Sequence, residues 1–555
     1  MSLLASKTVR EVFMSKSKMI ILGMLVIVMV TGFILAGCEG NSPTDTPPVI
    51  PPPGSETELT VSAGEFSETL QSISATPGEY IINLSGNLSD YEGISLTKEG
   101  VKITVKGTGS NEISWKQASG GPSSLFHVNG ASLVLENIKL SRSADNTSGG
   151  ELLSVDGGTL EIKSGVIISN NIAETEYYDG IKIIGGVFTM TDGTIQDCKN
   201  GVIVDGNGTS VTISKAIVRN NTEIGLNLVG TNCNLIVSDT TFTGNGSSGK
   251  DDINFTSVNL GGTENHCIIS GGIISGTVND NGLNISGTKN SVIITGMESR
   301  LNRYNGIITG SLSANCNVII NNSIFKNNLS FGFRITGSGH SILVSGGEFS
   351  ENAASGIFTR SESSNNNLIV NNATIKNNND NGIYIDGINN SVTVTSVTIN
   401  DNKNTGIGVG GTDNTVAMTG GTISGSKNYD GINIGGTNNS VTMTGGTISG
   451  NNHNGIVLHN SSNNCSFTMS GGTISGNESY GVLLWYSAGG SFKKGSGGVI
   501  MGNNTGDDLN KEGAVIICCD DGGPIRYSTV PNGEILEAAI KADGTLGATL
   551  GTWGY

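Results

Sequence analysis

The sequence Gly-Gly-Thr-Ile-Ser-Gly at residues 420–425 recurs unchanged at 445–450 and again at 471–476. A second phrase alternates with it, in which a glycine precedes alternating apolar residues, as in Gly431-Ile432-Asn433-Ile434. That glycine lies at positions 180, 201, 225, 282, 306, 332, 356, 382, 406, 431, 455 and 481. From 282 onward the spacing between successive copies is therefore nearly constant, alternating for the most part between 24 and 26 positions. A period of about 25 residues over such a length predicts a repeat architecture.

One period contains three short runs in which apolar and polar residues alternate. In the period that begins at Gly431, these runs are 432–434, 440–444 and 447–449, and Gly/Asn-rich turns separate them. Alternation at every second position is typical of strands and not of helices. We therefore expect one three-stranded coil per repeat, with each strand pairing in parallel to its equivalent in the next coil.

Proline and asparagine placement support a stack of coils. The chain has no proline between Pro122 and Pro524, and a proline inside a paired strand would remove a ladder hydrogen bond. Glycine and asparagine, which tolerate positive φ, dominate the expected corners. Asparagine side chains at equivalent corners are expected to hydrogen-bond from coil to coil.

These repeats resemble the right-handed parallel β-helix family, in particular the β-helix repeat lipoproteins of spirochaete type. The resemblance covers roughly residues 80–505, and the right-handed winding is implied by it. It implies an all-β right-handed parallel β-helix solenoid with three short strands in each coil of about 25 residues. It says little about function.

The composition limits the possible partners. The chain of 555 residues contains 83 glycines and carries a formal net charge of −17. Removing residues 1–37 leaves 26 basic and 46 acidic residues, a net charge of −20. Such an acidic body repels nucleic acid and anionic membrane surfaces, so neither is expected as a general partner.

The N-terminal segment, 1–58, is predicted to export and tether the protein. Lys16 and Lys18 precede an apolar run that ends in Leu35-Ala36-Gly37-Cys38, which resembles a bacterial lipoprotein signal with Cys38 as the lipidated residue. An uncleaved membrane anchor is the alternative. Residues 39–58 hold six of the ten prolines and are expected to form an extended spacer. We predict a signal peptide over 1–37 and a lipidated tether over 38–58, with localisation at the cell envelope, most simply the outer membrane and cell surface.

The β-helix is expected over 59–505, with a cap at each end. Ser62 to Glu65 reads as a capping box, and Phe66, Leu70 and Ile73 follow at helical spacing, so a short amphipathic helix is predicted at the N-terminal end. Residues 506–555 break the repeat and are predicted to form the C-terminal cap. In that cap, 514–518 and 525–530 are expected to be strands and 534–541 a short helix.

A carbohydrate-active site of the polygalacturonase kind would need several motifs in a fixed order. The chain contains Asp179, Asp430, the pair Asp251-Asp252, Gly339-His340 and Arg334-Ile335, but these pieces are incomplete and out of order. Asp179 and Asp430 occupy a turn slot that holds asparagine in other coils: Asn281, Asn305, Asn381 and Asn454. The simpler interpretation of both aspartates is therefore a turn residue. A hydrolase would also need two carboxylates at a set separation, and no neighbouring pair of coils stands out.

Histidine and cysteine show no metal spacing, so we expect no metal and no cofactor. The histidines are His127, His266, His340, His453 and His459. Besides Cys38 the cysteines are Cys198, Cys233, Cys267, Cys316, Cys465, Cys518 and Cys519. We expect small, stackable side chains at the coil positions, with Cys267 in the slot of Ser291. A disulfide between neighbouring coils, such as Cys233 with Cys267, is the alternative.

One outward column departs from the asparagine pattern. The residue two positions after the repeat glycine should point outward, and four successive coils place there Ile308, Arg334, Phe358 and Tyr384. Arg300, Arg303, Tyr304 and Arg360 are expected near the same edge. Exposed aromatic and arginine side chains suit contact with a ligand or partner. Outward strand positions also favour bulky residues for packing alone, which is the alternative.

The sequence leaves three functions to compare. The first is a non-enzymatic surface lipoprotein, an expected monomer, whose β-helix contacts host, matrix or glycan. The second is a cell-surface polysaccharide lyase or glycoside hydrolase, and the third is a structural coat protein. The incomplete catalytic motifs and the aromatic content of 5% favour binding and adhesion without catalysis.

Overall fold

The computed structural model describes residues 56–146, 149–172, 176–247, 256–485, 490–501, 503, 514–518, 526–529 and 536–539. The chain divides into two units, Met1–Gly54 and Ser55–Tyr555, and the description below concerns the second. The predicted signal peptide, Cys38 and nearly all of the predicted tether lie outside the described residues. No helix among the described residues is long and apolar enough to cross a membrane.

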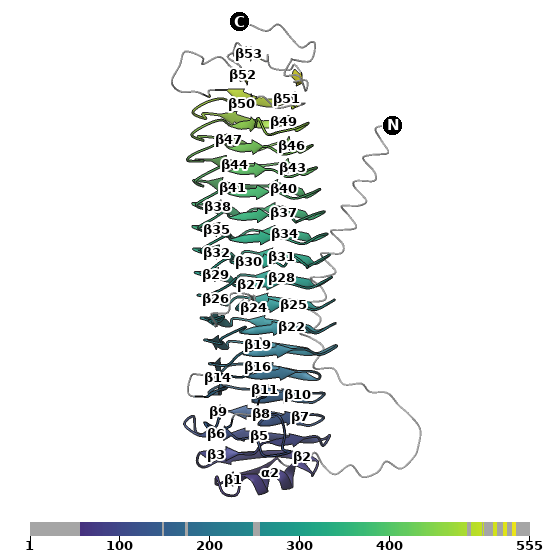
Figure 1. Cartoon of the computed structure of the whole chain (residues 1–555), viewed down its shortest axis with the longest axis vertical. Coiled ribbons are helices and arrows are strands. Elements are labelled where there is room, and N and C mark those ends of the chain that lie inside the picture. Colours follow the sequence, from purple (N-terminus) through teal and green to yellow (C-terminus); the bar gives the residue numbers. More distant parts are fainter. Residues whose placement is uncertain are drawn as a thin grey trace, which may run out of the picture. The chain divides into compact units, whose positions relative to one another are not determined.

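The second unit is an all-β parallel solenoid of about 17 coils, each of about 25 residues (Figure 1). Each coil contributes one strand to each of three sheets, called sheets 1, 2 and 3 in the order in which the chain visits them. Parallel pairing joins each strand to its equivalent in the next coil, as in β27 with β30 and β28 with β31. The three runs predicted after Gly431 are the strands β45, β46 and β47.

Sheet 1 follows the repeat glycine. Its strands are β4 (Ile94–Leu96), β7 (Phe126–Val128), β10 (Leu153–Val155), β15 (Ile181–Ile183), β18 (Val202–Val204), β21 (Leu226–Leu228), β24 (Val258–Leu260), β27 (Leu283–Ile285), β30 (Ile307–Thr309), β33 (Phe333–Ile335), β36 (Ile357–Thr359), β39 (Ile383–Ile385), β42 (Ile407–Val409), β45 (Ile432–Ile434), β48 (Ile456–Leu458), β50 (Val482–Trp485) and β52 (Ala514–Cys518).

Sheet 2 contains β1 (Thr57–Val61), β2 (Gly78–Leu84), β5 (Val101–Lys106), β8 (Ser132–Glu136), β11 (Thr159–Ile162), β16 (Val187–Met190), β19 (Ser210–Ser214), β22 (Asn234–Ser238), β25 (His266–Ser270), β28 (Ser291–Thr295), β31 (Asn317–Asn321), β34 (Ser341–Ser345), β37 (Asn367–Asn371), β40 (Ser391–Thr395), β43 (Thr415–Met418) and β46 (Ser440–Met443). Two long strands, β49 (Ser466–Ser475) and β51 (Ser491–Met501), run through both sheet 2 and sheet 3.

Sheet 3 contains β3 (Leu88–Tyr91), β6 (Glu112–Trp115), β9 (Lys139–Arg142), β12 (Ile167–Ser169), β17 (Thr194–Gln196), β20 (Ile217–Arg219), β23 (Thr241–Thr243), β26 (Ile273–Ser275), β29 (Glu298–Arg300), β32 (Ile324–Lys326), β35 (Glu348–Ser350), β38 (Thr374–Lys376), β41 (Val397–Asn400), β44 (Gly421–Ser424) and β47 (Thr447–Ser449). A small antiparallel pair, β13 (Asn171–Ile172) with β14 (Glu176–Tyr177), lies outside the three sheets.

The core consists of columns of alternate strand residues that point inward. In sheet 2, for example, Ile294, Ile320, Val344 and Val370 are in register and buried. Each such side chain contributes about 1.5–3 kcal/mol by leaving water. The stack is therefore stabilised by many similar layers, each of which contacts only its neighbours.

The predicted asparagine ladders are present at the corners. After sheet 3, Asn302, Asn328, Asn352, Asn378 and Asn402 are all buried. Each of the first four donates an Nδ2 hydrogen bond to Oδ1 of the next, at 2.9 to 3.0 Å. Since an unpaired buried amide is costly, these ladders hold adjacent coils in register.

A second ladder, before sheet 2, contains the cysteines and one histidine. The thiols of Cys233, Cys316 and Cys465 donate to glycine carbonyls of the preceding coil, as an asparagine amide does in the same slot. His340 is buried there, accepting from the Cys316 N–H at Nδ1 and donating from Nε2 to the Thr336 carbonyl. Burial lowers the pKa of His340 to about 4.

The described cysteines are all unpaired and buried, so the disulfide alternative is not supported at Cys198, Cys233, Cys267, Cys316 or Cys465. The slot predicted for Cys267 was wrong by one position. Cys267 pairs with Val292 and points into the core, while His266 occupies the slot of Ser291. The error arose because polarity, rather than strand register, was used to align the coils.

The N-terminal cap is a helix, as predicted. Helix α2 (Phe66–Ser74) buries Phe66, Leu70 and Ile73 against the end of the stack (Figure 1). Ser62 Oγ and N–H both donate to the Glu65 carboxylate, at 2.6 and 3.2 Å, so only the backward half of the capping box forms. Those hydrogen bonds lower the pKa of Glu65.

The C-terminal segment confirms two predicted elements and contradicts a third. Strands were expected at 514–518 and 525–530, and β52 and β53 (Arg526–Thr529) lie there. The helix predicted at 534–541 is instead a strand, β54 (Leu536–Ala539), antiparallel to β51. A short segment gains little from helix propensity, whereas the open edge of the last coil offers it a full set of backbone partners.

Candidate ligand-binding groove

The outward column of sheet 1 exists as predicted. Strand register aligns Asn284, Ile308, Arg334, Phe358 and Tyr384 in successive coils. Both neighbours of each residue along its strand point inward, because strand side chains alternate between faces. The column therefore lies on the outer surface of sheet 1.

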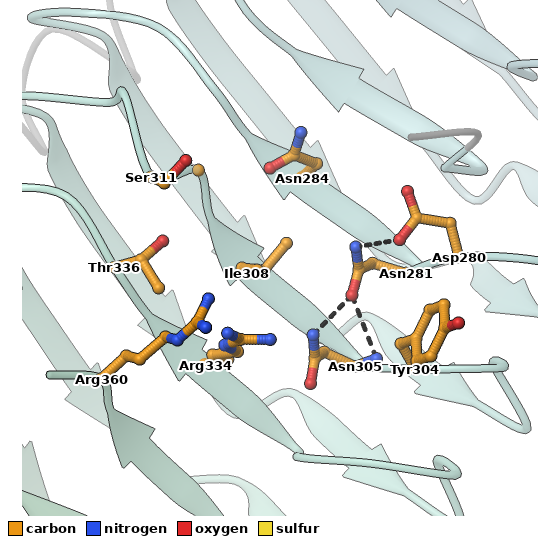
Figure 2. Close-up of a pocket in the computed structure, with 11 residues that line it drawn as sticks. Asp280, Asn281, Asn284, Tyr304, Asn305, Ile308, Ser311, Arg334, Thr336 and Arg360 are labelled. Carbon is orange, nitrogen blue, oxygen red and sulfur yellow. Dashed lines mark hydrogen bonds between the residues drawn. The ribbon is translucent and has the colours of Figure 1, made fainter. Parts of the chain in front are cut away.

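A pocket of about 300 Å³ lies over the N-terminal part of this column (Figure 2). Its lining residues come from several successive coils, so the pocket is a groove that runs along the stack, and it is called the groove below. They are Asp280, Asn281, Asn284, Tyr304, Asn305, Ile308, Gly310, Ser311, Arg334, Thr336 and Arg360.

Unequal coil lengths produce the groove. The segment 310–313 connects β30 to the bridge at Ala314, and the equally long segment 360–363 connects β36 to the bridge at Ser364. The coil between them uses only positions 336 and 337 to reach its bridge at Ser338. Two longer loops therefore flank a shorter one, and Arg334 lies in the recess between them. The alternating spacing of the repeat glycines is the sequence signal for this feature.

Two arginines form the C-terminal end of the groove. Burial lowers the pKa of Arg334, and the nearby positive charge of Arg360 lowers it further. The Arg334 Nε is buried without a hydrogen-bond partner. Arg360 Nε lies 2.8 Å from the exposed Glu362 carboxylate. Two guanidinium groups thus share one carboxylate, which leaves this end positive and suited to an anion.

Oxygen acceptors form the N-terminal end. Asp280 is 6% exposed, and burial raises its pKa to about 6. One of its oxygens, Oδ1, accepts from Asn281 Nδ2, while Oδ2 is buried without a partner. Asn284 Oδ1 is also buried without a partner, although its Nδ2 donates to Asn259 at 3.2 Å.

The aromatic residues of the column stack on one another. Phe331 and Phe358 are parallel with ring centroids 4.4 Å apart, and Phe358 and Tyr384 follow at 5.7 Å. A Cβ added at Gly408 would lie 2.6 Å from the Tyr384 ring, so the next coil covers the remaining face of that ring. Phe358 and Tyr384 therefore present their edges to a ligand, and their stacking also stabilises the column.

The remaining predicted residues are divided by the structure. Tyr304 lines the groove and is exposed. Arg300 belongs to β29 of sheet 3, where its Nε lies 3.3 Å from Glu298 Oε1, and it does not line the groove. Arg303 is exposed in the turn between β29 and β30 and is likewise absent from the lining. The expectation of one shared edge was therefore too broad for these two arginines, because a turn separates the sheets.

Asp179 and Asp430 are turn residues, as the simpler interpretation held. Asp179 accepts from Asn200, and Asp430 accepts from Asn454, in the ladder before sheet 1. The pair Asp251-Asp252 lies outside the described residues. In the part of the chain that the structure describes, no three His, Cys, Asp or Glu side chains group closely enough to hold a metal ion.

The sequence did not single out Asp280, Asn284, Ser311 or Thr336. Asp280 and Asn284 resemble the ordinary turn and column residues of other coils. A usable signal for the groove was Phe331, which interrupts the asparagine ladder after Asn305. Without an asparagine there, the ladder ends where the arginines begin.

Comparison with known proteins supports the fold. Residues 381–545 match the family described as right handed beta helix region. Together with the three parallel sheets, this match places the chain in the class of right-handed parallel β-helix solenoids. A search of curated proteins found no match.

Solved structures show distant likeness. A double mutant of the periplasmic alginate epimerase AlgG is 14% identical, with 60% of this chain and 74% of that chain covered and a TM-score of 0.31. The A-module of Azotobacter vinelandii mannuronan C-5 epimerase AlgE4 is 13% identical, covering 76% and 91%, with a TM-score of 0.25. The tailspike protein of E. coli bacteriophage HK620, solved with a pentasaccharide, is 12% identical, covering 78% and 77%, with a TM-score of 0.32. At these values the likeness carries no argument about ligand or reaction.

Proposed function

We propose that this protein is a lipid-anchored protein of the bacterial cell envelope whose β-helix binds an anionic glycan in the groove, without catalysis. The observation that carries the binding proposal is the adjacent pair Arg334 and Arg360, with the Arg334 Nε buried and unpartnered. An acidic chain has little reason to hold two guanidinium groups together unless an anion joins them.

Anchoring through Cys38 rests on the Leu-Ala-Gly-Cys sequence after an apolar run. Protease treatment of intact cells tests surface exposure, and replacement of Cys38 by Ser tests the anchor. We expect the wild-type protein to be cleaved on intact cells and the Cys38→Ser variant to leave the membrane fraction. Protection of the wild type until the cells are lysed would contradict surface exposure.

Binding is tested on an array of sulfated, carboxylated and neutral glycans. We expect anionic glycans to bind the wild type, and Arg334→Ala and Arg360→Ala each to weaken binding about tenfold or more, as loss of a charged hydrogen bond does. Arg219→Ala is the matched control, because Arg219 is an exposed arginine on β20 of sheet 3 that hydrogen-bonds Gln196. Equal binding by all three variants would overturn the proposal.

A polysaccharide lyase or hydrolase remains the second candidate because Asp280, with its pKa raised to about 6, could serve as an acid. Among the described residues that line the groove, however, Asp280 is the sole carboxyl group, and hydrolysis by paired carboxylates needs two. Release of products from acidic polysaccharides, with or without calcium, in a manner that Asp280→Ala abolishes, would establish the enzyme instead.

A further inference from the structure

Three buried polar atoms in the groove have no partner: Asp280 Oδ2, Asn284 Oδ1 and Arg334 Nε. A buried polar atom without a partner costs free energy, and most proteins satisfy almost all of them. Asp280 and Asn284 are both at least nine-tenths buried. Their grouping in one groove points to a ligand that supplies the missing hydrogen bonds.

These atoms are arranged with opposite polarity along the stack. The two oxygens need donors, and the arginine nitrogen needs an acceptor. Asn284 pairs with Ile308, which pairs with Arg334, so Asn284 and Arg334 are two strand spacings apart, about 10 Å. Figure 2 shows the same order, with Asp280 and Asn284 on one side of Ile308 and the arginines on the other. A single small anion cannot reach both ends.

We propose that the groove binds a polyhydroxylated polyanion lengthwise, with an anionic group on Arg334 and Arg360 and hydroxyl groups donating to Asn284 Oδ1 and Asp280 Oδ2. This inference rests on the proposed glycan binding and adds to it the direction of the ligand and the need for hydroxyl donors. Ile308, between the two ends, offers an apolar contact to the ring carbons. A polyanion without hydroxyl groups satisfies only the arginine end.

The test compares two probes of similar length and charge: a dextran sulfate oligosaccharide and poly(vinyl sulfonate), which has no hydroxyl groups. Affinities are measured by calorimetry. We expect Asn284→Ala and Asp280→Ala each to weaken oligosaccharide binding about five- to tenfold, the effect of one lost hydrogen bond, and to leave poly(vinyl sulfonate) binding unchanged. Arg334→Ala weakens binding of both probes.

Matched controls use the same slots outside the groove. Asn227→Ala lies in the same outward column, and Asp380→Ala lies in the same turn slot as Asp280. Both are expected to bind the two probes as the wild type does. The slot of Asp280 holds Ala354 in the coil of Gly356, so alanine is compatible with the fold there.

The outcomes separate this inference from the proposed function. If Arg334→Ala weakens both probes while Asn284→Ala and Asp280→Ala change neither, the hydroxyl subsite is wrong and glycan binding stands. If the two alanine variants weaken poly(vinyl sulfonate) as much as the oligosaccharide, the hydroxyl requirement is also wrong. If Arg334→Ala changes neither probe, the proposed function itself fails.

Discussion

Two buried aspartates show how the groove differs from the regular coils. Asp430 is 4% exposed and Asp280 is 6% exposed, and burial raises the pKa of both carboxyl groups. Asp430 accepts hydrogen bonds from Asn454 and Asn433, so its place in the ladder is complete. Asp280 keeps one oxygen without a partner. The repeat normally satisfies its buried polar groups, and the groove is where it leaves several of them open to a ligand.

The largest expected effect is loss of a ladder residue. Asn352→Ala removes both donors and the acceptor that Asn328, Asn378 and the Phe325 carbonyl use. We expect a loss of about 3 kcal/mol or more, since several buried groups lose partners at once. Chemical denaturation monitored by circular dichroism measures it. The exposed neighbour Asn379→Ala is the control, expected within about 0.5 kcal/mol of the wild type.

Asp280→Asn should stabilise the protein at neutral and alkaline pH. Because burial raises the pKa of Asp280 from 3.8 to about 6, the folded state binds its proton more tightly than the unfolded state. Stability therefore falls as pH rises from about 4 through 6, and the asparagine removes up to about 3 kcal/mol of this penalty at pH 8.

Melting temperatures at pH 4 and pH 8 check this prediction. Asp380→Asn serves as the control, because Asp380 already accepts from Ser355 and Asn404. A gain for Asp280→Asn that is equal at both pH values would show that ionisation is not the cause.

His340→Asn should protect the protein against acid. Burial lowers the pKa of His340 from 6.5 to about 4, so stability is complete above pH 6.5 and is lost as pH falls towards 4. Asparagine fills the same ladder slot in the next coil, at Asn366, and does not ionise. We expect a gain of about 2 kcal/mol at pH 5.

Denaturation midpoints at pH 5 and pH 7.5 measure the effect of His340→Asn. Loss of stability at both pH values would indicate that the imidazole makes contacts that an asparagine cannot replace.

The smallest effect is expected for Arg300→Ala. Arg300 lies on sheet 3, outside the groove, and its pair with Glu298 is partly exposed, so the pair is worth about 0–1 kcal/mol. Anionic glycan binding should stay within about twofold of the wild type, a change that corresponds to less than about 0.5 kcal/mol. A loss comparable to that of Arg334→Ala would extend the site around the corner to sheet 3.

Much of the fold could be predicted because each coil repeats the same local pattern. Strand alternation, glycine corners and the absence of proline all indicated a three-stranded coil, and the described strands confirm it. The prediction failed at 534–541, where pairing with β51 decided the structure. It also failed for the slot of Cys267, because side-chain polarity alone does not set register.

The candidate site was predicted in part. Ile308, Arg334, Arg360 and Tyr304 line the groove, while Arg300 and Arg303 do not. Asp280 could not be singled out, because an aspartate before a turn asparagine occurs in a similar context at Asp380. The two differ through the loops and side chains of neighbouring coils, which have no signature within either residue's own coil.

The sequence by itself determined the coil, the inward columns and the asparagine ladders, because these follow from a short local pattern that every repeat must satisfy to stack. Only the tertiary structure decided which outward residues form a site. Burial of Asp280, the missing partners of Asn284 and Arg334, and the recess between 310–313 and 360–363 depend on contacts among coils far apart in the chain. Such contacts arise from the stacking of the coils, which brings residues as distant in the chain as Asp280 and Arg360 into one groove.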